Sequence, residues 1–191
     1  MALTLNGSNN TIAGVAVGGL PDGIVDTDML AASAVTAPKR GTGAVLQVVF
    51  ADTNTEFVSN SDSFEDIGLS ASITPIATSS KILCLAQVQA RCFIAEANRD
   101  NGFSLQLVRG STAIQTTPQG YQVGYNHINV FNQTSENSHM VPVNHLDTPN
   151  TTSATTYKIQ ARCRDATGSN KVDFQDDNYY YSTLTLMEVA G

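Results

Sequence analysis

The sequence has no tryptophan, few charged residues and no positively charged segment. Charged residues make up 14% of the 191 residues, whereas about 25% is typical of soluble proteins. The formal net charge is −7, and without a basic stripe we do not expect binding to a nucleic-acid backbone. No apolar run approaches the roughly 20 residues that a membrane-spanning helix needs, and the first residues lack the pattern of a secretory signal. We therefore expect neither nucleic-acid binding nor membrane insertion.

Cysteine is also scarce, with three residues in the chain. Cys84 and Cys92 would lie on one face of one strand, roughly 26 Å apart at the usual strand rise, and cannot bridge each other. Neither they nor Cys163 have the close Cys or His spacing of a zinc site. We expect three small core hydrophobes in a chain folded in a reducing cytoplasm, with no metal and no cofactor.

The clearest pattern that is present is an alternation over residues 80–96. Gln87, Gln89 and Arg91 fall on one face, with Leu83, Leu85 and Phe93 as apolar exceptions among them. The other face is apolar throughout and consists of Ile82, Cys84, Ala86, Val88, Ala90, Cys92 and Ile94. Because successive strand side chains point to opposite faces, this segment is predicted to be one long strand buried on one side. Such a strand needs neighbouring strands and a second layer beneath its apolar face.

From residue 44 onward the other apolar segments also have the spacing of strands. We expect them at 45–50, 63–74, 103–107, 121–131, 140–146, 155–164, 171–174 and 182–189, with a tight hairpin at 109–113. A turn is expected at 99–102 and a polar loop at 132–138, and Pro142 indicates an edge strand or a bulged one. About eight strands at this spacing predict an all-β fold, a jelly-roll-like antiparallel β-sandwich over residues 44–191.

Residues 1–43 differ from the rest because they are rich in Gly and Ala and lack sustained alternation. Pro21, Asp22 and Gly23 form a turn signal, and acidic residues before Met29 predict a short helix at about 27–34. A segment of this kind buries little by itself. We expect a short, largely irregular N-terminal arm that is ordered only against other copies or a partner.

Two parts of the sequence carry a resemblance to a known family. The first, over 18–41, reads GGLPDGIVDTDMLAASAVTAPKRG, and the second comprises SSKILCLAQVQ, FSLQLVRGSTAI, LDTPNTTSATTYKIQAR and STLTLMEVAG. The first resembles the N-terminal and shaft segments of tail-fibre proteins of tailed phages, especially those of marine cyanobacterial and related phages, and the second resembles their head domain in both sequence and segment order. The resemblance implies a homotrimeric protein of the virion surface, made in the host cytoplasm, whose jelly-roll head contacts host glycans.

This sequence departs from a long fibre because almost no shaft lies between arm and head. The departure suits a short fibre, a fibre tip or a small trimeric decoration on the capsid or tail. The favoured hypothesis is a receptor-binding fibre. The alternative is a decoration or head-fibre protein that mainly stabilises the particle, and a carbohydrate-cleaving enzyme is the disfavoured third hypothesis.

Candidate contact residues fall into three groups. Arm residues expected to dock onto tail or capsid proteins are Leu20, Ile24, Val25, Met29 and Leu30. In the last strand Leu184 and Leu186 point one way, and the residues pointing the other way, expected at the trimer interface, are Thr183, Thr185, Met187 and Val189. Candidates for glycan contact, through tyrosine stacking and hydrogen bonds from their neighbours, are Tyr179, Tyr180, Tyr181, Asp176, Asp177 and Asn178.

Two alternatives accompany the glycan candidates. One or two of the three tyrosines could instead pack into the sandwich, and we weigh the two interpretations equally. The loop at 132–139 is a second candidate contact surface, because binding groups concentrate on loops carried by rigid scaffolds.

We expect no catalytic residue. Paired carboxylates occur at Asp26/Asp28, Glu65/Asp66 and Asp176/Asp177. Glycoside cleavage, in contrast, needs two carboxylates facing across a sugar, about 5–9.5 Å apart. Neither a GxSxG nor an HExxH motif is present. The histidines, His127, His139 and His145, lack the H-x-H spacing of an axial metal site in a trimer and are expected to be surface residues or ordinary hydrogen-bonding groups.

Overall fold

The computed structural model describes residues 4–6, 11–13, 35–36, 39–94, 100–116, 123–127, 135–166, 170–175 and 180–191. The chain divides between Arg40 and Gly41 into two units, which are described separately. In the first unit, β1 (Thr4–Asn6) and β2 (Thr11–Ala13) form an antiparallel pair, which the sequence did not predict. The helix expected at 27–34 and the five docking candidates lie outside the described residues.

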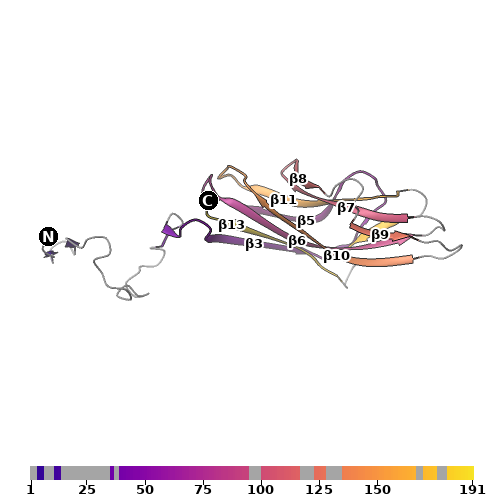
Figure 1. The fold of residues 1–191 in the computed structure, drawn as a ribbon, viewed down its shortest axis with the longest axis horizontal. Helices are drawn as coiled ribbons and strands as arrows, with labels where there is room; N and C mark the ends of the chain where they lie inside the picture. Colours follow the sequence, from indigo (N-terminus) through magenta and orange to yellow (C-terminus); the bar gives the residue numbers. More distant parts are fainter. Residues whose placement is uncertain are drawn as a thin grey trace. The chain divides into compact units, whose positions relative to one another are not determined.

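The second unit is a sandwich of two antiparallel sheets, whose strands run lengthwise through the unit (Figure 1). Sheet I contains β3 (Val45–Thr53), β4 (Phe57–Ser59), β6 (Lys81–Ile94), β10 (Ser135–Asp147), β12 (Lys171–Phe174) and β13 (Ser182–Val189). Sheet II contains β5 (Glu65–Ile73), β7 (Asp100–Arg109), β8 (Thr112–Thr116), β9 (Val123–His127) and β11 (Thr155–Cys163).

Several of these strands are halves of one longer, interrupted strand. Since β10 occupies one side of β6 along nearly its full length, β13 and β12 must share the other side, where they pair with 81–87 and 90–93 of β6. They therefore run end to end. In the same way β3 and β4 follow β13 and β12, and β8 and β9 share the side of β7 that faces away from β11.

Each sheet is consequently four strands wide. Sheet I has the order β3/β4, β13/β12, β6, β10, and sheet II has the order β5, β11, β7, β8/β9. Lettered A to H along the chain, the strands are ordered A-H-C-F in one sheet and B-G-D-E in the other. This is the arrangement of an eight-stranded jelly roll. The predicted all-β, jelly-roll-like sandwich is confirmed, and its strand order is new information.

Strand β6 is the centre of sheet I, as its alternation predicted. It pairs with β10, β12 and β13, and its inward side chains are almost completely buried in one core together with Tyr157, Ile159 and Phe103. The three cysteines are buried and form no disulfide bond. Burial raises the pKa of Cys84 and Cys92 to about 12 and that of Cys163 to about 11, so these thiols are unreactive at neutral pH.

Two predicted connections are wrong. Residues 100–102, expected in a turn, belong to β7, because the buried Asn101 amide donates to the carbonyls of Phe93 (3.0 Å) and Lys171 (2.9 Å). Residues 135–138, expected in a loop, belong to β10, because pairing with β6 continues as far as Ile94. The predicted edge character around Pro142 is confirmed, since β10 pairs with β6 and with no other described strand.

Candidate interaction surfaces

The outer face of sheet I carries apolar side chains at neighbouring positions on four strands. The register places Val48, Met187, Leu83 and Leu146 in one row across β3, β13, β6 and β10. The neighbouring rows also carry apolar side chains, with Phe50 and Leu85 on one side and Val45 and Val189 on the other. We call this surface the apolar face; its members are Val45, Val48, Phe50, Leu83, Leu85, Leu146, Thr185, Met187 and Val189. Its β3 and β10 side chains are well exposed, Phe50 at 61%, Val48 at 54% and Leu146 at 51%.

The predicted interface residues of the last strand lie on this side of the sheet. Thr183, Thr185, Met187 and Val189 are half-buried, whereas Leu184 and Leu186 are fully buried in the core. The two different faces of this strand are therefore as expected; the trimer stays a prediction. Sequence reasoning missed the contributions of β3, β6 and β10. Leu83 and Leu85 could have indicated the contribution of β6, because they are apolar residues on the otherwise polar face of the central strand.

The outer face of sheet II is polar instead. One straight cross-strand row runs through Thr116, Gln106, Gln160 and Asp66. The hydroxyl of Thr116 donates to Gln106 (3.3 Å), the Gln106 amide to Gln160 (2.5 Å), and the Gln160 amide to Asp66 (2.8 Å). These groups satisfy one another across the full width of the sheet.

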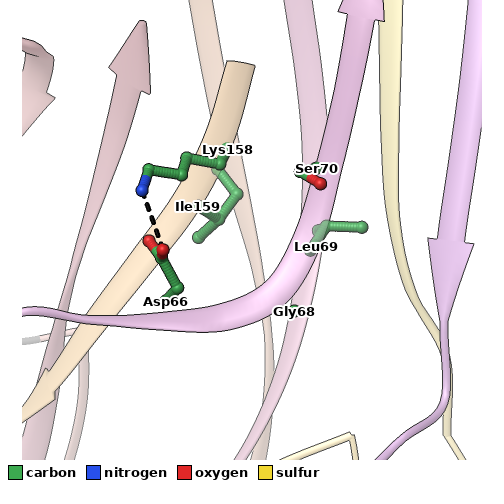
Figure 2. A pocket seen from close by; sticks show the side chains of 6 residues that line it. All are labelled: Asp66, Gly68, Leu69, Ser70, Lys158 and Ile159. Atoms are coloured by element: carbon green, nitrogen blue, oxygen red, sulfur yellow. Dashed lines mark hydrogen bonds and ion pairs between the residues drawn. The ribbon is translucent and has the colours of Figure 1, made fainter. Parts of the chain in front are cut away.

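A hollow of about 160 Å³ lies at one end of this row (Figure 2). It is lined by Asp66, Gly68, Leu69, Ser70, Lys158 and Ile159. The hollow forms at a bulge where three residues of β5 oppose one of β11, and Gly68 adopts the positive φ of 82° that the bulge requires.

The charged groups of this hollow bind each other. Lys158 Nζ lies 2.8 Å from Asp66 Oδ2, and the dashed line in Figure 2 marks this ion pair. The hydrogen bond from Lys158 is the main reason that the pKa of Asp66 lies below its ordinary value. Glu65 points to the opposite face of β5 and accepts from Ser59 (3.0 Å). Glu65 and Asp66 therefore do not face each other across one site.

The glycan candidates lie at the interruption between β12 and β13. Tyr180 and Tyr181 are 43% and 53% exposed, and residues 176–179 lie outside the described part of the chain. The base of the interruption is fixed by Ser182, whose hydroxyl oxygen accepts from the Gln89 backbone (3.0 Å) and from the Gln175 amide (3.0 Å). Gln175 is fully buried and has a φ of 49°. The two described tyrosines thus directly precede Ser182, which is hydrogen-bonded to the sheet.

The second candidate contact surface, the loop predicted at 132–139, is in part a strand, because residues 135–139 belong to β10. His139 is half-buried, with its ring 6.2 Å from that of Phe103. His139 and His145 are both strand residues of β10.

Three carboxylates are buried among the described residues, and each has a structural contact. Asp147 of β10 binds two residues of sheet II: Arg109 Nη1 lies 2.9 Å from each of its oxygens, and the Tyr157 hydroxyl donates to it at 2.6 Å. Burial, together with this hydrogen bond, raises the pKa of Tyr157. Asp173 is bound by Arg91 (2.8 Å) and Lys171 (3.0 Å).

Glu188, the third, holds the connection between β5 and β6. It accepts from the Ile76 backbone (2.7 Å) and from the Gln47 amide (2.5 Å). Burial by itself raises its pKa, but hydrogen bonds from Gln47 and from the backbone of Ile76 and Ala77 outweigh burial and leave the pKa below its ordinary value.

Within the described ranges, His, Cys, Asp and Glu side chains nowhere gather in a group of three or more that could hold a metal ion. In the same part of the chain, no helix has the length and apolar character needed to cross a membrane.

Comparison with known proteins adds little to this picture. No protein-family model matches the sequence, and no curated protein is detectably similar to it. Among solved structures, the VP2 subviral particle of infectious bursal disease virus matches with 14% identity and a TM-score of 0.35, over 76% of this chain and 38% of that one. The Gx strain of the same virus matches with 16% identity and a TM-score of 0.32, over 76% and 37%.

A third match is dimeric latent PorU from Porphyromonas gingivalis, with 9% identity and a TM-score of 0.25, over 79% of this chain and 14% of that one. The chain therefore spans less than two fifths of the length of each of these proteins. Likeness at these scores carries no argument about function. The class of the second unit, an eight-stranded jelly roll, rests on its own strand order.

Proposed function

We propose that this chain is a non-enzymatic structural protein of a phage particle, a tail-fibre-like homotrimer. Residues 1–43 dock onto other virion proteins, and the jelly roll projects outward to contact a host-surface glycan. Support comes from the resemblance of several sequence segments to tail-fibre proteins. It also comes from the strand order, since jelly rolls are frequent in viral capsid and lectin domains. The second argument is an analogy at the level of the fold.

The observation that carries the glycan role is the pair of exposed tyrosines at the interruption of sheet I. Tyr180 and Tyr181 present apolar rings and hydroxyl tips to solvent, and aromatic faces of this kind stack on sugar rings. The residue directly after them, Ser182, is anchored by hydrogen bonds from the Gln89 backbone and the Gln175 amide. A rigid base of this kind reduces the ordering cost of binding.

Electron microscopy of intact virions, labelled with an antibody raised against residues 44–191, tests the location. Label on the tail supports the adsorption role. Label spread over the head supports the second candidate, a decoration or head-fibre protein, and absence of label from particles contradicts both.

Glycan contact is tested by binding of the full chain to an array of host glycans. Replacing Tyr180 and Tyr181 together with Ser should abolish binding, while Thr116→Ser, on the opposite sheet, should retain it. Unchanged binding by the tyrosine variant would remove this site from the proposal. Release of sugar from the array would instead indicate the disfavoured enzyme.

A further inference from the structure

The apolar face of sheet I is comparable in size to the largest apolar patch of a typical monomer. Four strands about 4.8 Å apart and three rows about 6.8 Å apart cover roughly 19 Å by 20 Å, or about 400 Å², with the positions of Asn144 and Lys81 included. The largest apolar patch on a typical monomer measures about 300–600 Å² and is often functional. Phe50, Val48 and Leu146 hold about half or more of their surface in solvent, although strands β3 and β10 could carry polar residues at these positions without disturbing the core.

The two central rows of the face contain no charged residue. They run from Val48 to Leu146 and from Phe50 to Asn144. Charges begin at the rim, with Lys81 beyond one end and Asp52 beyond the other. An uncharged apolar centre with a polar, charged rim is the usual anatomy of a protein–protein interface.

We propose that the apolar face is the surface through which copies of this chain associate, so that its occupant is a second copy. Two copies that each carry a net charge of −7 repel each other, and the face is a surface on which they can approach without bringing like charges together. Its rim carries one charge of each sign, Lys81 and Asp52, which two copies can pair with each other.

A face of this size can form the centre of an interface between two copies, but not the whole of it. A stable interface buries about 800 Å² on each partner, with an apolar centre and a polar rim around it. The apolar face supplies roughly half of that area by the same strand-spacing estimate, and Thr183, Gln87 and Asp52 in the adjoining row supply polar surface. Among the side chains that the structure describes, the outer face of sheet II, with its satisfied polar row, has no comparable apolar area.

Association through the apolar face does not depend on the proposed role in the virion. It is a property of the chain in solution, whereas the virion role is tested on particles. If antibody labelling fails while association persists, the proposed function is wrong and the apolar face remains an interface.

The first experiment measures the mass of the full chain by sedimentation equilibrium over a concentration series. Wild type should form an assembly, and Phe50→Lys should weaken association at least tenfold because it places a charge in the uncharged centre. Ala113→Lys is the matched control, since Ala113 is an exposed residue of β8 paired with Val108 in sheet II. It should associate like wild type. Circular dichroism melting verifies that both variants are folded.

A second measurement avoids adding charge. The native cysteines are buried, so a cysteine introduced at Thr185 or at Ala113 supplies the reactive thiol. Labelling of Thr185→Cys by a maleimide should slow at least tenfold between dilute and concentrated protein, while Ala113→Cys should react at one rate throughout.

Three outcomes would overturn the inference. The first is a monomeric wild type at every concentration. The second is an assembly that Phe50→Lys leaves intact. The third is a monomer in which Thr185→Cys is protected regardless of concentration, which would mean that another segment of the same chain covers the face.

Discussion

The two sheets of the sandwich distribute polar and apolar groups in opposite ways. Sheet II follows the common pattern, with apolar side chains inward and a hydrogen-bonded polar row outward. Sheet I holds two buried carboxylates on its inner face, Asp147 and Glu188, and presents the apolar face outward over β3, β13, β6 and β10. Its third buried carboxylate, Asp173, lies on the outer face of β12, where it pairs with Arg91. Since both sheets bury one face in the same core, the difference lies in their outer faces. The polar row of sheet II suits contact with water, and the apolar face of sheet I suits the contact between copies that we propose.

The largest effect should come from the carboxylate that joins the sheets. Asp147→Ala leaves Arg109 and the buried Tyr157 hydroxyl without their acceptor, and should lower the free energy of unfolding by about 3 kcal/mol. Its counterpart is Asp66→Ala on the outer face of sheet II, where the side chain is 53% exposed and also pairs with a cation. That variant should lose less than about 1 kcal/mol. Urea denaturation measures both free energies of unfolding. Equal losses in the two variants would mean that the buried and the exposed carboxylate contribute equally to stability, against this comparison of the two sheets.

The next effect depends on pH. The pKa of Glu188 is lowered in the folded protein, so its carboxylate stabilises the fold above the unfolded-state pKa of about 4.3. That contribution disappears as the pH falls through the folded-state pKa. Glu188→Gln should therefore cost about 2 kcal/mol at pH 7 through its lost charged hydrogen bonds, and wild type and variant should converge in acid.

Urea denaturation at pH 7 and at pH 3 gives the two differences. The control is Asp66→Asn, because the pKa of Asp66 is also lowered but its side chain is mostly in water. Its pH dependence should have the same sign and a smaller size. A Glu188→Gln penalty that persists unchanged at pH 3 would show that shape, and not charge, is lost.

The sequence correctly predicted the strands in which burial of one face makes apolar and polar residues alternate. The alternation of β6 and β11 identified their buried faces, and the last strand showed both of its faces. In each case the pattern is local, because burial on one side of a strand repeats every second residue. The eight-stranded architecture followed from the number and spacing of such segments.

The parts that were missed depend on distant partners. The start of β10 is polar and becomes a strand because β6 extends alongside it. Glu188 looks like a surface residue until Gln47 and Ile76, 141 and 112 positions away, bring their N–H groups to it. The apolar face shares this origin, since β3, β13, β6 and β10 become neighbours only through the strand order.

A smaller effect concerns the bulge in β5. Gly68 has a φ of 82°, and a Cβ built there would have nothing within 4 Å. Gly68→Ala should therefore cost about 1–2 kcal/mol through backbone strain alone. Ser70→Ala, two residues along on the same face, should be nearly neutral. Thermal melting compares the two variants. A neutral Gly68→Ala would mean that the bulge can relax, and that the polar outer face of sheet II does not require this backbone conformation.

The smallest effect separates the two outer faces most cleanly. Gln160→Ala interrupts the polar row of sheet II by removing the acceptor of Gln106 and one donor to Asp66. Because these groups are partly exposed, water replaces the lost bonds, and the cost should be about 0.5–1 kcal/mol. The assembly measured by sedimentation should not change. Phe50→Lys should do the reverse and weaken association while the stability of the sandwich stays within about 1 kcal/mol.

This pair of variants decides whether the two faces have separate roles. If Gln160→Ala also dissociates the assembly, sheet II takes part in the contact between copies, and the polar row is an interface and not a solvent face. If each variant changes only its own property, the jelly roll keeps one outer face for solvent and the other for its neighbour. The exposed Tyr180 and Tyr181 would then be the contact group to examine on the assembled protein.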